Sequence, residues 1–191
     1  MKRNLKIAGV LALIAVICAL AIAGMNMVTS GIIKANTEKT ELKTCQAIFS
    51  SYDKDKSEEM TSSNEAITKK VLARDSNGNE LGYLYTVTGK NAYGAITIMV
   101  AVKDDKVLQV EFLENGQSFA STVTSHVQNS YPSSPDDSVH VGAYKKEEAL
   151  NIGSLSSSEI DGIDTACGAT YGAKLVKELV NIALQDAKGG K

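Results

Sequence analysis

The most apolar part of the chain lies near its N-terminus. Residues 7–28 form an uncharged run rich in Ala, Ile, Leu and Val, and Lys2, Arg3 and Lys6 precede it. About 20 apolar residues in a helix are enough to cross the hydrocarbon core of a bilayer. The run therefore predicts one transmembrane helix over residues 7–28. The positive charges predict that residues 1–6 are cytoplasmic and that the rest is extracytoplasmic.

A cleaved signal peptide is the alternative, because the small residues at 21–23 resemble a cleavage site. The apolar run is longer than an ordinary signal core, and a segment with helical character, residues 29–50, follows it directly. These two features favour a retained, single-pass anchor in the cell membrane. Residues 29–50 are predicted to form a juxtamembrane helix.

The middle of the chain has the pattern of β-strands. Residues 69–74 and 80–88 flank an Asn-Gly tip, which is a strong hairpin signal. Residues 93–102 and 106–113 are β-branched and apolar and flank a short charged turn. Two hairpins predict an antiparallel sheet with one face that needs a cover.

Helical periodicity returns after the strands. Residues 119–127 suggest a short helix, and a longer one is predicted from Thr170 onward. Its apolar residues recur on one face at Leu175, Val176, Leu179, Val180 and Ala183. This C-terminal helix is the predicted cover of the sheet. The fold class is therefore α+β, with an N-terminal transmembrane helix before an antiparallel-sheet domain that helices cover.

The remaining segments are predicted to be less regular. Residues 50–66 are charged and Ser-rich and predict a solvated loop, and residues 154–161 predict a Ser-rich linker. Residues 139–144 predict a short strand.

Composition excludes several functions. The chain has 191 residues with a net charge of −2, no Trp and few Phe, so a nucleic-acid partner is not expected. Its cysteines and histidines lack the spacing of a metal site, and His126 is predicted to be an ordinary surface residue. A disulfide between Cys45 and Cys167 cannot be established from spacing, and two free thiols are preferred.

The stretch from Asp164 to Lys174 carries the candidate chemistry. Thr170 stands at or just before a predicted helix start, behind the small residues Gly168 and Ala169. Unpaired N–H groups and the positive end of the helix dipole favour a phosphate there. The hydroxyl of Thr170 can cap the helix or carry a group covalently.

This stretch resembles the flavinylation motif of the FMN-binding domain in the G subunit of Rnf-type ferredoxin:NAD oxidoreductases and the C subunit of Na+-translocating NADH:quinone oxidoreductases. That motif reads Asp, two residues, Ser or Thr, Gly, Ala, Thr. Asp164, Gly168, Ala169 and Thr170 match it, whereas Cys167 replaces the hydroxyl residue with a weaker hydrogen-bonding group.

The resemblance implies roles for individual residues. Thr170 would bear FMN through a phosphoester, and Asp164 would be recognised by the flavin transferase, which uses FAD and leaves FMN behind. Gly168 and Ala169 would keep the backbone close to the phosphate. Tyr171 would border the flavin ring.

A second segment departs from the family. Residues 114–122 replace a Glu-Thr-Pro-Gly-Leu-Gly sequence that lies beside the flavin in the resembled proteins, and Gln117 and Ser118 are its polar stand-ins. The anchor, the juxtamembrane helix, the hairpins, the motif and the last helix nevertheless follow the family order. Residues 51–191 are therefore predicted to be an FMN-binding domain.

The function implied is electron transfer by a membrane-anchored subunit of an Rnf-type complex. The flavin would supply the chemistry, because no residues form an acid–base set of their own. Partner subunits would translocate Na+ or H+. Two alternatives remain: a stand-alone anchored flavoprotein that serves an extracytoplasmic acceptor, and an anchored binding or assembly domain without flavin.

Overall fold

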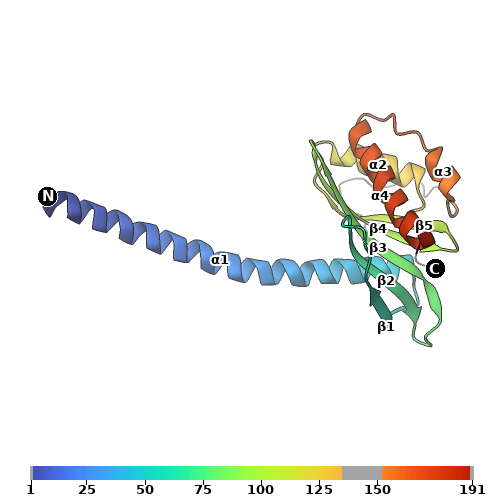
Figure 1. The fold of residues 1–191 in the computed structure, drawn as a ribbon, viewed down its shortest axis with the longest axis horizontal. Coiled ribbons are helices and arrows are strands. Elements are labelled where there is room, and N and C mark those ends of the chain that lie inside the picture. Colours follow the sequence, from blue (N-terminus) through green and yellow to red (C-terminus); the bar gives the residue numbers. More distant parts are fainter. Residues whose placement is uncertain (1, 135–151, 190–191) are drawn as a thin grey trace. The chain divides into compact units, whose positions relative to one another are not determined.

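The computed structural model describes residues 2–134 and 152–189 and has an α+β fold (Figure 1). The chain divides into two compact units, Met1–Thr40 and Glu41–Lys191. The elements are α1 (Lys2–Ile48), β1 (Tyr52–Met60), β2 (Ile67–Asp75), β3 (Glu80–Asn91), β4 (Gly94–Lys103), β5 (Lys106–Asn115), α2 (Ala120–Ser130), α3 (Ser157–Asp161) and α4 (Thr170–Gly189). The strand predicted at residues 139–144 lies outside the described residues.

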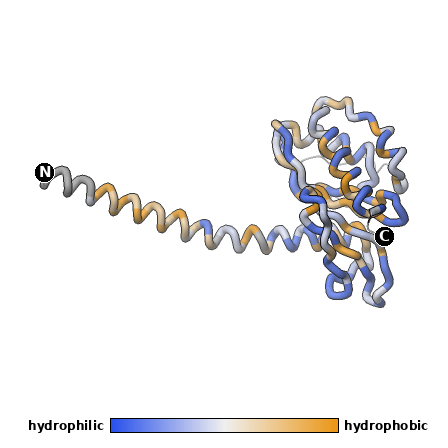
Figure 2. The backbone as a smooth tube through the Cα atoms, in the orientation of Figure 1, coloured by the Kyte–Doolittle hydropathy of each residue, from blue (hydrophilic) through white to orange (hydrophobic). Residues whose placement is uncertain are grey.

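The predicted transmembrane and juxtamembrane helices form one continuous helix, α1, of 47 residues. At a rise of 1.5 Å per residue such a helix is about 70 Å long, more than twice the roughly 30 Å hydrocarbon core of a bilayer. Its apolar residues are concentrated in the N-terminal half, and polar residues become frequent toward Ile48 (Figure 2). The helix is therefore long and apolar enough to anchor the protein in a membrane.

The sheet is a simple meander with the strand order β1-β2-β3-β4-β5, and every neighbouring pair is antiparallel. The two predicted hairpins are present as β2–β3 and β4–β5. The central pair β3–β4 keeps one register from Tyr83 opposite Val102 to Asn91 opposite Gly94. The prediction of an antiparallel sheet is confirmed.

The prediction of a solvated loop over residues 50–66 is wrong, because this region contains β1. The strand pairs with β2 at the edge of the sheet, and most of its side chains are exposed. Its register shifts between Asp53 and Glu58. Backbone pairing holds this strand, and its charges discourage association through the open edge. A strand of this kind has no alternation of apolar and polar residues to reveal it.

The predicted Ser-rich linker at residues 154–161 contains a short helix, α3. Ser156 and Glu159 form a capping box in which the Glu159 carboxylate accepts a hydrogen bond from the Ser156 N–H at 2.8 Å. Ile160 is fully buried and fixes the helix to the core. The Ser-x-x-Glu spacing was the sequence signal that the linker interpretation overlooked.

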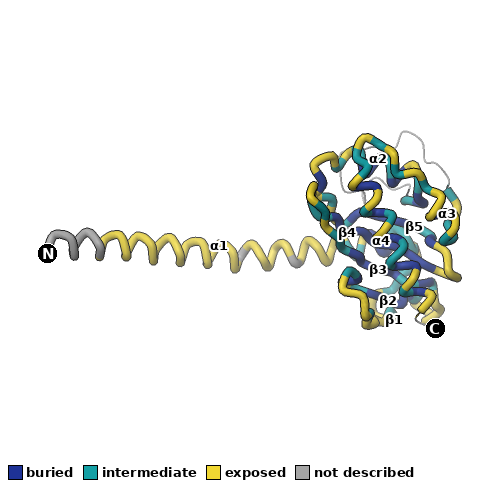
Figure 3. The backbone as a smooth tube through the Cα atoms, turned by 45° about the horizontal axis from the view of Figure 1, so that its top comes forward, coloured by how far each residue is buried: buried dark blue, intermediate teal, exposed yellow. Residues whose placement is uncertain are grey.

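Both faces of the sheet are covered. On one face α2 and α4 bury the main core, which includes Tyr85, Ile98 and Val100 of the sheet and Val176 and Leu179 of α4. The buried strands lie beneath α4 in Figure 3. The prediction that the C-terminal helix covers the sheet is confirmed.

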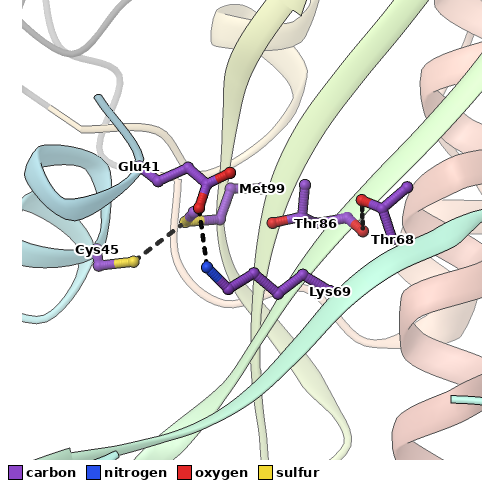
Figure 4. Close-up of polar contacts among 6 residues, drawn as sticks. All are labelled: Glu41, Cys45, Thr68, Lys69, Thr86 and Met99. Atoms are coloured by element: carbon purple, nitrogen blue, oxygen red, sulfur yellow. Dashed lines mark hydrogen bonds and ion pairs between the residues drawn. The ribbon is translucent and has the colours of Figure 1, made fainter. Parts of the chain in front are cut away.

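The last turns of α1, from Glu41 onward, cover the opposite face. Cys45 is buried there, with its Sγ 3.8 Å from Met99 Sδ, and Glu41 Oε2 accepts a hydrogen bond from Lys69 Nζ at 2.9 Å (Figure 4). Cys45 and Cys167 are free thiols. The second compact unit therefore includes the end of the helix.

An ion pair ties the C-terminal half of α4 to β2. Lys70 is only 6% exposed, and its Nζ lies 2.7 Å from Asp186 Oδ2, while Ser62 Oγ donates to Asp186 Oδ1 at 2.7 Å. Burial tends to raise the pKa of the Asp186 carboxyl, but the hydrogen bonds from Lys70 and Ser62 outweigh it and hold this pKa below its ordinary value. At pH values where Asp186 is ionised, the ion pair stabilises the fold. This contribution is lost as the pH falls through the lowered pKa of Asp186.

Replacing Lys70 with Met should lower the free energy of unfolding at pH 7 by about 3 kcal/mol, because Asp186 is left mostly buried without its cation. Denaturant unfolding of the detergent-solubilised chain measures this. The loss should shrink in acid. The neighbouring substitution Lys69→Met is the matched control, since Lys69 is 38% exposed and its pair with Glu41 should contribute at most about 1 kcal/mol. Equal losses in the two variants would contradict the role of the buried pair.

Gly172 allows the first turn of α4 to lie close to α2. A Cβ at this position would overlap Val123 Cγ2 and would stand 3.3 Å from Gln117 Oε1. Val123 is fully buried and cannot move aside freely. The missing side chain thus sets the distance between the two helices.

Gly172→Ala should destabilise the protein by about 1–3 kcal/mol through overpacking, although alanine ordinarily favours a helix. Gly168→Ala is the control, because its nearest neighbour would be Thr122 Cγ2 at 3.6 Å, an ordinary contact. Thermal unfolding of the two variants compares them. Adding Val123→Ala should restore part of the loss at Gly172. If Gly172→Ala left the thermal stability unchanged, the missing side chain would not be what sets the distance between α2 and α4.

Candidate functional site

A pocket of about 270 Å³ opens where the β3–β4 turn, the segment after β5, α2 and the start of α4 meet. It gathers residues that lie far apart in the sequence. The lining residues are Tyr93, Gln117, Phe119, Val123, Gly168, Ala169, Thr170, Tyr171 and Gly172. Five of the residues predicted for the site, namely Gln117, Gly168, Ala169, Thr170 and Tyr171, are among them.

Thr170 is the first residue of α4 and is half-buried. Its hydroxyl donates a hydrogen bond to the Cys167 carbonyl at 2.8 Å. The Ala169 carbonyl accepts from the N–H groups of Gly172 and Ala173 and so begins the helical hydrogen bonding. A capping hydroxyl accepts a hydrogen bond from a backbone N–H, whereas this one donates to a carbonyl that precedes the helix. The geometry therefore differs from that of a simple N-cap.

The start of α4 gives the pocket a positive end. The helix has 20 residues and no acidic residue in its first turn, so nothing there opposes its dipole. The first N–H groups of a helix have no partner within the helix. A phosphate beside Thr170 would meet both these groups and the dipole.

Three exposed aromatic side chains stand around the pocket. Tyr93, Phe119 and Tyr171 are 45–63% exposed, and the rings of Tyr93 and Tyr171 stack with centroids 5.3 Å apart. Large aromatic surface beside a pocket suits a flat ring system. The sequence pointed to Tyr171 only. Tyr93 and Phe119 were missed as site residues because the fold alone brings them to the start of α4.

A hydrogen-bonded network joins the three segments of the pocket. Gln117 Nε2 donates to Asn91 Oδ1 at 3.1 Å and to the Gly94 carbonyl at 2.6 Å, and Asn91 Nδ2 donates to the Tyr171 carbonyl at 3.2 Å. Gly94 has φ +140°, and a Cβ there would overlap the Gly116 carbonyl. Glycine at position 94 therefore allows the segment after β5 to lie close against the β3–β4 turn.

Three predicted residues do not line the pocket. Asp164 is exposed, and its Oδ1 accepts from the Ala166 N–H at 2.8 Å, which shapes the loop before the motif. Cys167 contributes its carbonyl to Thr170, and its thiol is half-buried. Ser118 is exposed and donates to the Tyr93 carbonyl at 3.3 Å. Their hydrogen bonds involve the backbone of the motif loop or of the β3–β4 turn.

His126 on α2 is not the ordinary surface residue that was predicted. It is half-buried, and its Nε2 is enclosed without a hydrogen-bond partner in the described part of the chain. Burial lowers the pKa of its imidazole, and the Asp164 carboxylate partly offsets this. The histidine therefore lies beside the motif in surroundings that disfavour its charged form. Residues 2–134 and 152–189 also contain no cluster of acidic, His or Cys residues that could hold a metal.

These residues can enclose one part of a flavin nucleotide in the pocket and contact another part of it at the protein surface. The pocket is slightly smaller than the roughly 300 Å³ at which small-molecule sites begin. It can thus enclose part of a flavin nucleotide, while the exposed aromatic side chains extend the contact surface outside it. The helix start suits the phosphate, and the rim suits the ring.

Comparison with known proteins agrees with this geometry. Residues 92–185 match the FMN-binding domain family. The match begins beside Tyr93 and ends within α4, and it includes every residue that lines the pocket. No curated protein matches the chain. The match supports a flavin-binding role in electron transfer for residues 92–185, with FMN as the cofactor.

Proposed function

We propose that the protein carries FMN covalently on Thr170 through a phosphoester and relays electrons within an Rnf-like membrane complex. The environment of the Thr170 hydroxyl supports this proposal most directly. Small residues, the positive end of α4 and an aromatic rim meet at one pocket around it. The small residues and the positive end of α4 suit the phosphate of FMN, and the aromatic rim suits its ring.

The chain's own residues have defined tasks in this proposal. Thr170 Oγ1 displaces AMP from the phosphorus of FAD and loses its proton, which leaves FMN esterified to the side chain. The N–H groups at the start of α4 bind the phosphate, and Gly168 and Ala169 keep the backbone close to it. The bound FMN supplies transfer of one or two electrons. Tyr93, Phe119 and Tyr171 hold the ring near the surface, where a partner's redox centre can approach.

The membrane helix completes the proposal. Residues 7–28 retain the chain in the cell membrane, residues 1–6 are cytoplasmic, and the FMN domain lies on the extracytoplasmic side. Covalent attachment then prevents loss of the cofactor from a compartment where free FMN is scarce. The partners are other membrane subunits, which carry out the ion translocation, and the flavin transferase, to which exposed Asp164 is accessible. Co-purification of such subunits distinguishes this assembly from a stand-alone flavoprotein.

Thr170→Ala should abolish the covalent flavin. The wild-type chain, matured with an active transferase, should fluoresce under ultraviolet light in a denaturing gel and gain the mass of one FMN less one water. The variant should do neither, yet remain folded, because it loses a single hydrogen bond worth about 1 kcal/mol. Thr165→Ala is the matched control and should keep the flavin. A wild-type chain that stays unmodified beside an active transferase would falsify the proposal.

Membrane sidedness gives a separate prediction. In a Cys167→Ser background, Asn77→Cys at the exposed β2–β3 turn should react with a membrane-impermeant maleimide in intact spheroplasts. Lys2→Cys should react only after permeabilisation. The opposite labelling pattern would place the FMN domain in the cytoplasm and exclude the proposed location.

A further inference from the structure

Gln117 occupies an unusual place in the pocket. It is only 7% exposed and lies between the β3–β4 turn and the first turn of α4. A buried polar side chain ordinarily has all its hydrogen-bonding groups satisfied. Its amide nitrogen has two acceptors, whereas its Oε1 has no partner in the described part of the chain.

The hydrogen bonds determine which side-chain amide atom is oxygen and which is nitrogen in Asn91 and in Gln117. The Tyr93 N–H can only donate, so the Asn91 atom that it contacts at 2.8 Å must be the oxygen. Gln117 contacts that same Asn91 oxygen, and therefore presents its nitrogen there. The Gly94 carbonyl requires the same orientation. The amide cannot flip without losing both bonds, and Oε1 is left as a fixed acceptor.

Oε1 lies beside the start of α4, 3.3 Å from the place that a Cβ of residue 172 would take. Because residue 172 is glycine, no side chain covers this oxygen. Tyr93, Phe119 and Tyr171 line the same pocket. A flat ring with an N–H donor at its edge can use all these groups at once. Phosphate oxygens cannot take this place, because they are acceptors too.

We propose that Gln117 Oε1 accepts a hydrogen bond from the imide N–H of the flavin ring and so selects and orients the ring in the pocket. This inference rests on the proposed flavin function and assigns the ring, rather than the ribityl hydroxyls or the phosphate, to the Gln117 side of the pocket. Asn91 is a positioning residue that acts through Gln117.

Paired ligands test the proposal without altering the protein. The full chain in detergent, produced without the transferase, is titrated with lumiflavin and with 3-methyllumiflavin, which lacks the ring N–H, and quenching of flavin fluorescence is followed. Lumiflavin should bind about 3- to 10-fold more tightly, the range expected for one neutral hydrogen bond. In Gln117→Leu the two ligands should bind equally. Gln46→Leu, the same substitution at an exposed position of α1 away from the pocket, is the control and should keep the preference.

Equal binding of the two ligands to the wild-type chain overturns the proposal, and so does a lack of lumiflavin binding. A preference that survives Gln117→Leu also overturns it, because another acceptor would then be responsible. The covalent test is independent of these results. A fluorescent Thr170 adduct without ligand preference refutes the role of Gln117 alone. Ligand preference without an adduct refutes the attachment and leaves the role of Gln117 intact.

Discussion

The burial of the apolar stripe of α4 against the sheet is the contact on which the rest of the structure depends. Val176, Leu179, Val180, Ala183 and Leu184 lose nearly all their exposure in it. Burial of each of the valine and leucine side chains contributes roughly 1.5–3 kcal/mol of transfer free energy, and that of Ala183 contributes less. Because this stripe fixes both the axis and the rotation of the helix, it also fixes where the helix begins. Thr170 therefore occupies a defined position over the β3–β4 turn.

The pocket forms because α4 has this fixed position and because two glycines let neighbouring segments lie close together. Gly94 lets the segment after β5 lie against the β3–β4 turn, and Gly172 lets α4 lie against α2. The Asn91–Gln117 network then holds the pieces together through directional bonds. The site is built at the edge of a rigid core, with its aromatic groups in solvent. This arrangement suits a cofactor that must be held firmly and still meet partner proteins.

Much of this could be predicted from sequence where local signals are strong. The hairpins follow from an Asn-Gly tip and from β-branched runs, and α4 follows from its 3.6-residue period. The motif residues around Thr170 are contiguous and so could be found together. The edge strand β1 could not be found, because backbone pairing holds it and its side chains remain solvated. Tyr93 and the locked orientation of Gln117 also could not be predicted, since both depend on contacts between distant segments.

The end of α1 has a consequence for where the chain can be shortened. Residues from Glu41 to Ile48 cover the face of the sheet that carries Val71, Ala73, Leu84, Met99 and Ala101. A soluble fragment that started at residue 51 would expose this face and self-associate through it. Processing before Glu41, such as signal cleavage near residue 23, would leave the second unit whole. Removal of the apolar part of α1 and loss of the fold are thus separable events, because the two depend on different parts of one helix.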